Sequence, residues 1–237
     1  MIVGLYLDDF SLLNKVTNKL KSKEFNLKHV KSIPNVGEKI AVVISKDRLK
    51  NCIIPQIQPG NLDILELRLR CVFYNCEKVV AGIDPGGTNG LAIIGSKRLL
   101  YQNEFENIEE LSNIIKSINE EIGLKTIKIG SGSPPERNQI MKSLHNYSDL
   151  IKLVNEESSG SGSHTTAATR IALRKESSEN LEVYKPKDGE IAWVQQESRR
   201  LSKGLVTIDK LLAQQILIGE ISMEEAIKTY TKRMKVH

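Results

Sequence analysis

Short aliphatic runs and segments with apolar residues at helical spacing follow one another along the chain and fall into three groups. In the first group, residues 1–77, apolar runs over 2–7 and 39–44 predict buried strands. Asp8 or Asp9 can cap a helix whose apolar residues recur every three or four positions, and residues 62–74 predict another helix. The expected order, β-α-β-β-α, indicates a small α/β domain.

The second group, residues 78–180, carries five strand patterns. They cover residues 78–83, 91–94, 99–105, 126–129 and 150–154. Asn107 predicts the start of one helix, Pro134-Pro135 the start of a second, and residues 165–174 form an alanine-rich third. The order is therefore β-β-β-α-β-α-β-α. Three consecutive strands followed by alternating helices and strands form an unusual order, which specifies the fold more closely than the α/β class alone.

The third group, residues 181–237, predicts a helical region with three helices. The expected apolar face of its first helix consists of Trp193, Val194, Ser198 and Leu201. Thr207 is the expected cap of the second helix. Ser222 and Glu225 have the spacing of a capping box for the third.

Composition adds three constraints to this picture. Only 5% of the 237 residues are aromatic against 40% hydrophobic, so the core consists mainly of Ile, Leu and Val, as suits a parallel sheet covered by helices. The formal net charge of +5 permits a polyanionic partner without requiring one. Three cysteines without metal-ligand spacing, and no apolar run near the roughly 20 residues of a membrane span, predict a cytoplasmic protein with reduced thiols and no membrane partner.

The segment with the most chemical information is the turn at residues 84–90, Asp-Pro-Gly-Gly-Thr-Asn-Gly. Asp84 ends a buried strand, where open α/β sheets place their ligands, and its carboxylate suits a hard divalent cation. Glycine lets a phosphate approach the backbone closely. The candidate phosphate contacts in this turn are Gly86, Gly87, Thr88 and Asn89. The alternative is a plain hairpin turn in which Asp84 and Asn89 bond local amides only.

These residues resemble a known family. Residues 82–86 (Gly-Ile-Asp-Pro-Gly) followed by 90–92 (Gly-Leu-Ala) resemble the first-strand motif of RuvC-type Holliday junction resolvases and their YqgF-like relatives. Residues 154–159 are similar to the fifth-strand segment of the YqgF-like group, and 166–172 to its alanine-rich helix. The resemblance covers roughly residues 78–175, and the whole chain looks like an archaeal-type RuvC-like protein. It implies a ribonuclease H-like domain, a mixed five-stranded sheet with helices, between the small α/β domain and the helical region.

The resemblance also implies a reaction, which is phosphodiester hydrolysis by two Mg²⁺ or Mn²⁺ ions held by carboxylates. Asp84 matches the first metal ligand of the family, and Glu156, or alternatively Glu157, is the candidate for the second. In the family's fold the fourth strand lies between the first and the fifth. Asp84 and Glu156 therefore start on the order of 10 Å apart, and the loop has to bring them together.

Two positions depart from the family pattern. The fourth strand runs into Ile-Gly-Ser-Gly at residues 129–132, where resolvases carry an acid. The last helix begins near His164, where the family usually has an aspartate. His164 can replace that carboxylate as a metal ligand or general base, or it can be a solvated loop histidine. The Ser/Gly-rich residues 156–164 can close over a phosphate or simply connect two elements.

Basic and small residues near the expected loop face are the candidate contacts to nucleic acid. These residues are Ser131, Arg137, Lys142, Arg170, Arg174 and Lys175. A second candidate patch, on the helical region, consists of Arg199, Arg200 and Lys203. Phosphate contacts from such side chains would make binding salt-dependent, whereas the alternative is an ordinary solvated surface.

Three functional hypotheses follow. The first is a metal-dependent nuclease, similar to a Holliday junction resolvase, that acts on structured DNA or RNA. A homodimer is compatible with this hypothesis. The second is a nucleic-acid-binding relative that has lost part of the acid set. The third is an actin-like or sugar-kinase-type protein, because residues 82–89 also resemble a nucleotide phosphate loop. The third needs a second lobe of similar fold, and the helical region after residue 181 cannot supply one.

Overall fold

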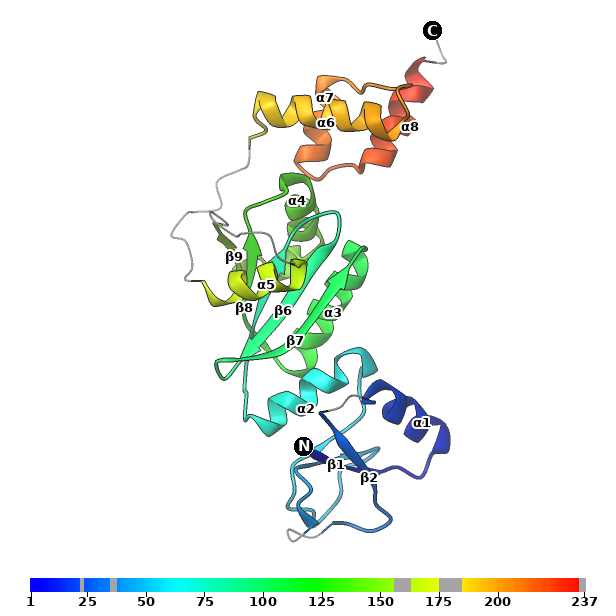
Figure 1. Cartoon of the computed structure of the whole chain (residues 1–237), viewed down its shortest axis with the longest axis vertical. Coiled ribbons are helices and arrows are strands. Elements are labelled where there is room, and N and C mark those ends of the chain that lie inside the picture. The colour runs from blue at the N-terminus through cyan, green and yellow to red at the C-terminus, as the bar shows by residue number, and fades with distance from the viewer. Residues whose placement is uncertain (22–23, 35–37, 156–162, 175–184, 235–237) are drawn as a thin grey trace.

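The protein is a mixed α/β structure with two sheets and a C-terminal group of helices. The computed structural model describes residues 1–21, 24–34, 38–155, 163–174 and 185–234. The two sheets and the helical group follow one another along the long axis of the molecule (Figure 1). Glu156, Glu157 and Lys175 lie outside the described residues.

The N-terminal part is a four-stranded sheet with helices beside it. Its strands lie in the order β2-β1-β3-β4, and every neighbouring pair is parallel. The expected strands near 2–7 and 39–44 are present. The structure has one strand more than the expected order β-α-β-β-α; β2 is largely exposed and β4 has only two residues. The elements are β1 (Ile2–Tyr6), α1 (Phe10–Lys19), β2 (Asn26–His29), β3 (Val42–Ser45), β4 (Gln56–Ile57), the 3-10 helix η2 (Leu62–Ile64) and α2 (Leu65–Phe73).

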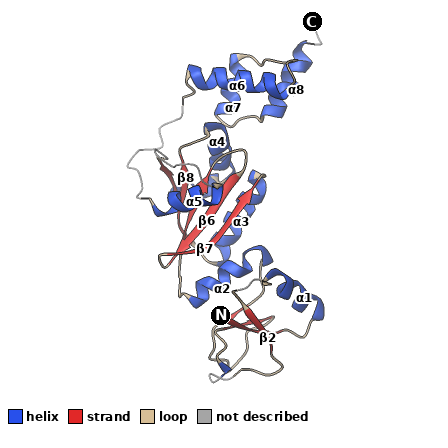
Figure 2. Ribbon diagram, in the orientation of Figure 1, coloured by secondary structure: helices blue, strands red, loops and turns tan. Residues whose placement is uncertain are grey.

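Helix α2 joins this part to the central sheet. Leu65 and Leu69 are buried in the N-terminal core, while Leu67 and Cys71 are buried in the central one. The apolar residues of one helix thus serve two cores, and Figure 2 shows α2 between the two sets of strands. The expected domain boundary near residue 77 therefore comes directly after a helix that contributes to both cores.

The central sheet has five strands in the order β7-β6-β5-β8-β9. Strands β5, β6 and β7 are antiparallel neighbours, whereas β8 and β9 run parallel to β5. Strand β8 lies between β5 and β9, as expected. The elements are β5 (Val79–Asp84), β6 (Asn89–Gly95), β7 (Arg98–Phe105), α3 (Ile108–Glu121), β8 (Leu124–Gly130), α4 (Pro134–Ser143), the 3-10 helix η3 (His145–Leu150), β9 (Ile151–Val154) and α5 (His164–Leu173).

The two faces of this sheet differ in composition because side chains of a strand alternate between faces. On β5, Ala81 and Ile83 are buried in the aliphatic core with residues of α3 and α4. Their neighbours Gly82 and Asp84 point to the other face, which α5 covers in front of the sheet (Figure 1). Asp84 therefore belongs to the face covered by α5.

The C-terminal helices pack around a separate apolar core. They are α6 (Asp188–Leu201), α7 (Lys210–Leu217) and α8 (Met223–Met234). The expected capping box is confirmed: Ser222 N–H donates to Glu225 Oε2 at 2.9 Å, and Glu225 N–H donates to Ser222 Oγ at 3.2 Å. The region contacts the central part through α4, where Asn138 Nδ2 donates to the Leu217 carbonyl at 2.5 Å.

Two expectations for these helices are wrong. The cap of α7 is Asp209, not Thr207, because Ile208 N–H donates to Ser198 Oγ and keeps the chain extended beyond position 207. The buried face of α6 consists of Ile191, Val194 and Ser198. Trp193 and Leu201, which were expected on that face, are 56% and 51% exposed.

Within the part of the chain that the structure describes, no helix combines the length and the apolar composition needed to cross a membrane.

Candidate functional site

The turn after β5 holds Asp84 in a buried position. Asp84 pairs with Gly90 at the end of the β5–β6 hairpin and is 8% exposed. Asn89 shapes the turn: its Oδ1 accepts the Gly86 N–H at 3.3 Å, and its Nδ2 donates to the Phe105 carbonyl at 3.2 Å. Asn89 thus bonds one local amide, as the plain-turn alternative requires, but also the carbonyl of Phe105 on the neighbouring strand β7.

Asp84, in contrast, contacts a residue 80 positions away in the sequence. His164 Nδ1 lies 3.0 Å from Asp84 Oδ2. Because an ionised carboxylate only accepts hydrogen bonds, Nδ1 carries the hydrogen, and Nε2 of a neutral imidazole is left as an acceptor. The side chain of His164 is 47% exposed against 12% for Asp84. The pair therefore has a buried carboxylate and an accessible imidazole, and the plain-turn alternative is wrong for Asp84.

Glycines on the same face of the sheet allow this contact. A Cβ added to Gly90 would lie 2.2 Å from the His164 carbonyl oxygen, and one added to Gly82 would lie 2.3 Å from the Ala168 carbonyl oxygen. Helix α5 therefore rests directly on the backbone of β5 and β6. Ser163 caps the helix, since its Oγ accepts the Thr166 N–H at 3.3 Å, and this fixes the first turn that carries His164.

Lys128 holds the other end of α5. It lies on β8 opposite Gly82, is 9% exposed, and its Nζ donates to the Arg174 carbonyl at the C-cap of the helix. A cation there satisfies a terminal carbonyl and complements the helix dipole. Lys128 was not among the predicted site residues. The only signal for it in the sequence is a lysine inside the aliphatic strand pattern 126–129.

The other predicted turn residues lie close to the Asp84–His164 pair. Gly86 is next to it, since a Cβ there would lie 3.6 Å from His164 Cε1. Gly87 is exposed, with no atom within 4 Å of an added Cβ, and Thr88 is half-buried. These positions leave the turn backbone beside the imidazole open to a ligand.

The predicted basic residues are spread more widely. Arg137 is 8% exposed and its Nη1 donates to the Ser131 carbonyl at 2.9 Å, so the guanidinium holds the end of β8. Arg170 is exposed on α5. Arg174 is half-buried and donates to the Asn155 carbonyl. Arg170 is the exposed one of these arginines on the helix that carries His164, and the contacts of all of them with nucleic acid stay predictions.

The second oxygen of Asp84 is the donor at this site that can hold a metal ion, whereas Nε2 of His164 lies on the side of the ring away from the carboxylate. Among the residues with described positions, no three His, Cys, Asp or Glu side chains form a group that could hold a metal. Strand β8 ends at Gly130 without an acid. This single carboxylate fits one cation that takes its other ligands from water or a phosphate, as Mg²⁺ and Mn²⁺ do. It does not make up a two-metal centre.

Known proteins offer distant similarity. A family model described as "Three helical bundle domain" matches residues 187–232, which cover nearly all of α6, α7 and α8. No curated protein matches the chain. The structure of Thermus thermophilus RuvC is 13% identical, with a TM-score of 0.32, and the match covers 40% of this chain and 90% of that one. The structure of the Aquifex aeolicus PPX-GPPA enzyme is 12% identical, with a TM-score of 0.19, and the match covers 92% of this chain and 75% of that one. The first is a distant likeness of fold, and neither carries an argument about activity.

Proposed function

We propose that the central part is a ribonuclease H-like domain and that the protein is a divalent-metal-dependent nuclease. The observation that carries the proposal is the Asp84–His164 pair at the carboxyl end of β5, with Nδ1 and Oδ2 3.0 Å apart. The strand order β7-β6-β5-β8-β9 supports the domain assignment, because it puts the first strand in the middle of the sheet. Open α/β sheets place their ligands at this edge.

The two side chains have complementary roles in such a reaction. Asp84 fixes the ring of His164 and leaves Nε2 directed to solvent as an acceptor. Nε2 takes a proton from the water that attacks phosphorus and later returns it to the leaving oxygen. A Mg²⁺ or Mn²⁺ ion on the second oxygen of Asp84 would polarise the phosphate. The open backbone at Gly86 and Gly87 lies beside the imidazole and can donate to phosphate oxygens.

Nucleic acid is the proposed substrate because the site needs an accessible phosphodiester and the chain has a net charge of +5. Arg170 is exposed on the same helix as His164, and we propose that it contacts a phosphate of the bound strand. We propose that the substrate is structured DNA or RNA, and that Glu156 or Glu157 contributes a further carboxylate.

A second candidate is a nucleic-acid-binding protein of the same fold without catalysis. The observation in its favour is the end of β8 at Gly130, where the acid of the resolvases is replaced. The third hypothesis, a two-lobed nucleotide-binding protein, has no such support. From residue 185 to 234 the structure describes helices only, and the N-terminal sheet is entirely parallel, unlike the central one.

A cleavage assay separates these candidates. Four-way DNA junctions, single-stranded DNA and hairpin RNA are incubated with the full chain and Mg²⁺ or Mn²⁺. We expect Asp84→Asn to lower the rate by about 10²-fold or more, because it weakens both the cation site and the orientation of His164. Asp149→Asn is the matched control, since Asp149 is exposed in η3. It should cleave like the unaltered protein.

Each other result has a clear meaning. Full activity of Asp84→Asn would contradict the nuclease proposal. Salt-dependent binding without metal-dependent turnover would favour the non-catalytic candidate, and absence of binding to all three substrates would contradict both.

A further inference from the structure

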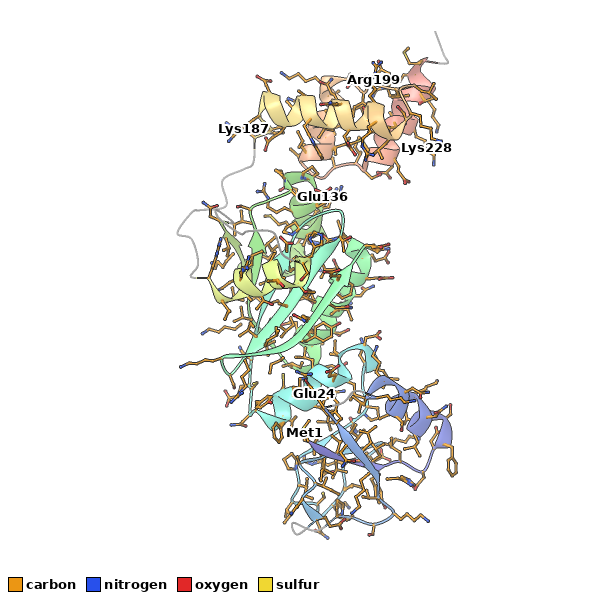
Figure 3. All side chains as sticks on the ribbon, in the orientation of Figure 1. Met1, Glu24, Glu136, Lys187, Arg199 and Lys228 are labelled. Atoms are coloured by element: carbon orange, nitrogen blue, oxygen red, sulfur yellow. The ribbon has the colours of Figure 1, made fainter. Side chains whose placement is uncertain are left out.

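A groove lies between the central part and the C-terminal helices, and neither Asp84 nor His164 lines it. It has a volume of about 310 Å³, and the first turn of α4 forms one wall while α6 and the end of α7 form the other. The residues that matter are Pro134, Pro135, Glu136, Glu190, Trp193 and Leu217. Figure 3 shows Glu136 on the end of the central part that faces the C-terminal helices.

The apolar part of the groove is built around Trp193. This is the only tryptophan of the chain, and 56% of it is exposed although it stands beside the buried Val194. Two prolines at the start of α4 stiffen the opposite wall. An exposed indole next to rigid apolar surface is a suitable face for a flat or cationic group.

The polar part of the groove is acidic. Burial raises the pKa of Glu136, because the carboxylate is partly removed from water. Within the described ranges, neither Glu136 nor Glu190 forms an ion pair with a lysine or arginine, and no basic residue lines the groove. Glu190 uses one oxygen to accept the backbone N–H of Lys187 at 2.8 Å, so Glu136 is the carboxylate of the two that is not engaged in this helix cap.

We propose that this groove binds an arginine side chain of a partner protein, with the guanidinium stacked on Trp193 and donating to Glu136. A guanidinium matches both features at once, since it is planar, weakly hydrated and able to donate two parallel hydrogen bonds to a carboxylate. It also supplies the positive charge that Glu136 lacks. A nucleic-acid strand fits less well, because two carboxylates would repel its phosphates. The site shares no residue with the proposed nuclease centre and does not depend on that activity.

The single tryptophan makes the groove directly observable. The fluorescence of Trp193 in the full chain is followed while an acetylated and amidated Gly-Gly-Arg-Gly-Gly peptide is added. A peptide with citrulline in place of arginine has nearly the same shape without the charge. We expect a saturable change in emission with the arginine peptide, and at least about tenfold weaker binding of the citrulline peptide, as for the loss of one partly desolvated charged contact.

Variants test the assignment of the carboxylate. Glu136→Gln should weaken binding of the arginine peptide by about tenfold. Glu104→Gln, an exposed change on β7, should leave binding unchanged. Circular dichroism verifies that both variants are folded, and calorimetry on Trp193→Ala should show weakened binding without relying on fluorescence.

Three results would overturn the proposal. These are an equal response to the arginine and citrulline peptides, unchanged binding by folded Glu136→Gln, or no response at all. A single-stranded oligonucleotide that changes the Trp193 emission more strongly than the arginine peptide would also overturn it, in favour of a base-stacking surface.

Discussion

The two faces of the central sheet are built from the same strands and yet have different chemistry. The face toward α3 and α4 carries large aliphatic side chains such as Ile83, Leu91 and Ile93, all of them fully buried. The face toward α5 carries Gly82, Asp84, Gly90 and Lys128 at the alternate positions. The face toward α3 and α4 thus buries large aliphatic side chains. The face toward α5 has glycines at positions where such side chains would stand, so α5 can lie close to the Asp84 carboxylate.

This difference shows where stability and function separate in the fold. Polar and small residues beneath a helix are a poor choice for burial alone, because glycine buries no side chain and a buried carboxylate needs a partner. On the α5 face these polar and small residues allow the contact between Asp84 and His164. Changes on the aliphatic face should therefore alter stability, whereas changes on the α5 face should alter the pair.

The largest loss of stability is expected from Ile83→Ala. Ile83 is fully buried in the aliphatic core, so the change removes apolar burial and leaves a cavity worth about 2–5 kcal/mol of unfolding free energy. Urea denaturation measures this loss. Below the transition, the folded variant should keep the Asp84–His164 pair and any cleavage activity. A folded variant without activity would show that the two faces are not separable.

A smaller loss, about 1–3 kcal/mol, is expected from Gly90→Ala, because the new methyl group meets the backbone of His164 and displaces the start of α5. The NMR signals of the His164 ring should move, and cleavage should fall with them. Gly87→Ala is the matched control for the His164 signals alone, since its methyl group meets nothing within 4 Å while its backbone is a proposed phosphate contact. Unchanged His164 signals in Gly90→Ala would contradict the account of the close approach.

The smallest effect, roughly 1 kcal/mol, is expected from Lys128→Met. Methionine can replace the aliphatic stem of lysine in the buried position, but it cannot donate to the Arg174 carbonyl. Hydrogen exchange should become faster in the last turn of α5 and stay unchanged at its first turn. Equal acceleration along the whole helix would mean that Lys128 does not act on the C-terminal end.

Much of the fold could be predicted because its signals are local. The aliphatic run before Asp84, the Asn107 cap of α3 and the Ser222–Glu225 capping box are each contained within a few residues. The local signal gave the wrong residue at the start of α7, where two nearby side chains can both act as a helix cap. Thr207 and Asp209 are both good caps, and the choice depends on Ser198, which belongs to another helix.

The site was predicted only in part. Asp84 could be singled out as the carboxylate at a strand end, and His164 as a candidate for replacing an acid. Their contact joins residues 80 positions apart and depends on how closely α5 approaches Gly90, which no sequence pattern states. Strand β2 was missed for a similar reason: its mostly exposed residues show no apolar alternation, and it is defined by its pairing with β1.

The central claim is that Asp84 and His164 act as one unit, and a double-mutant cycle on metal-dependent cleavage tests it most directly. The rates of Asp84→Asn, His164→Gln and the double variant are compared with that of the unaltered protein. If His164 works only when oriented by Asp84, either change should lower the rate by about 10²-fold or more, and the double variant should be little slower than the single variants. Losses that multiply in the double variant would show that the two side chains act independently and would contradict the account.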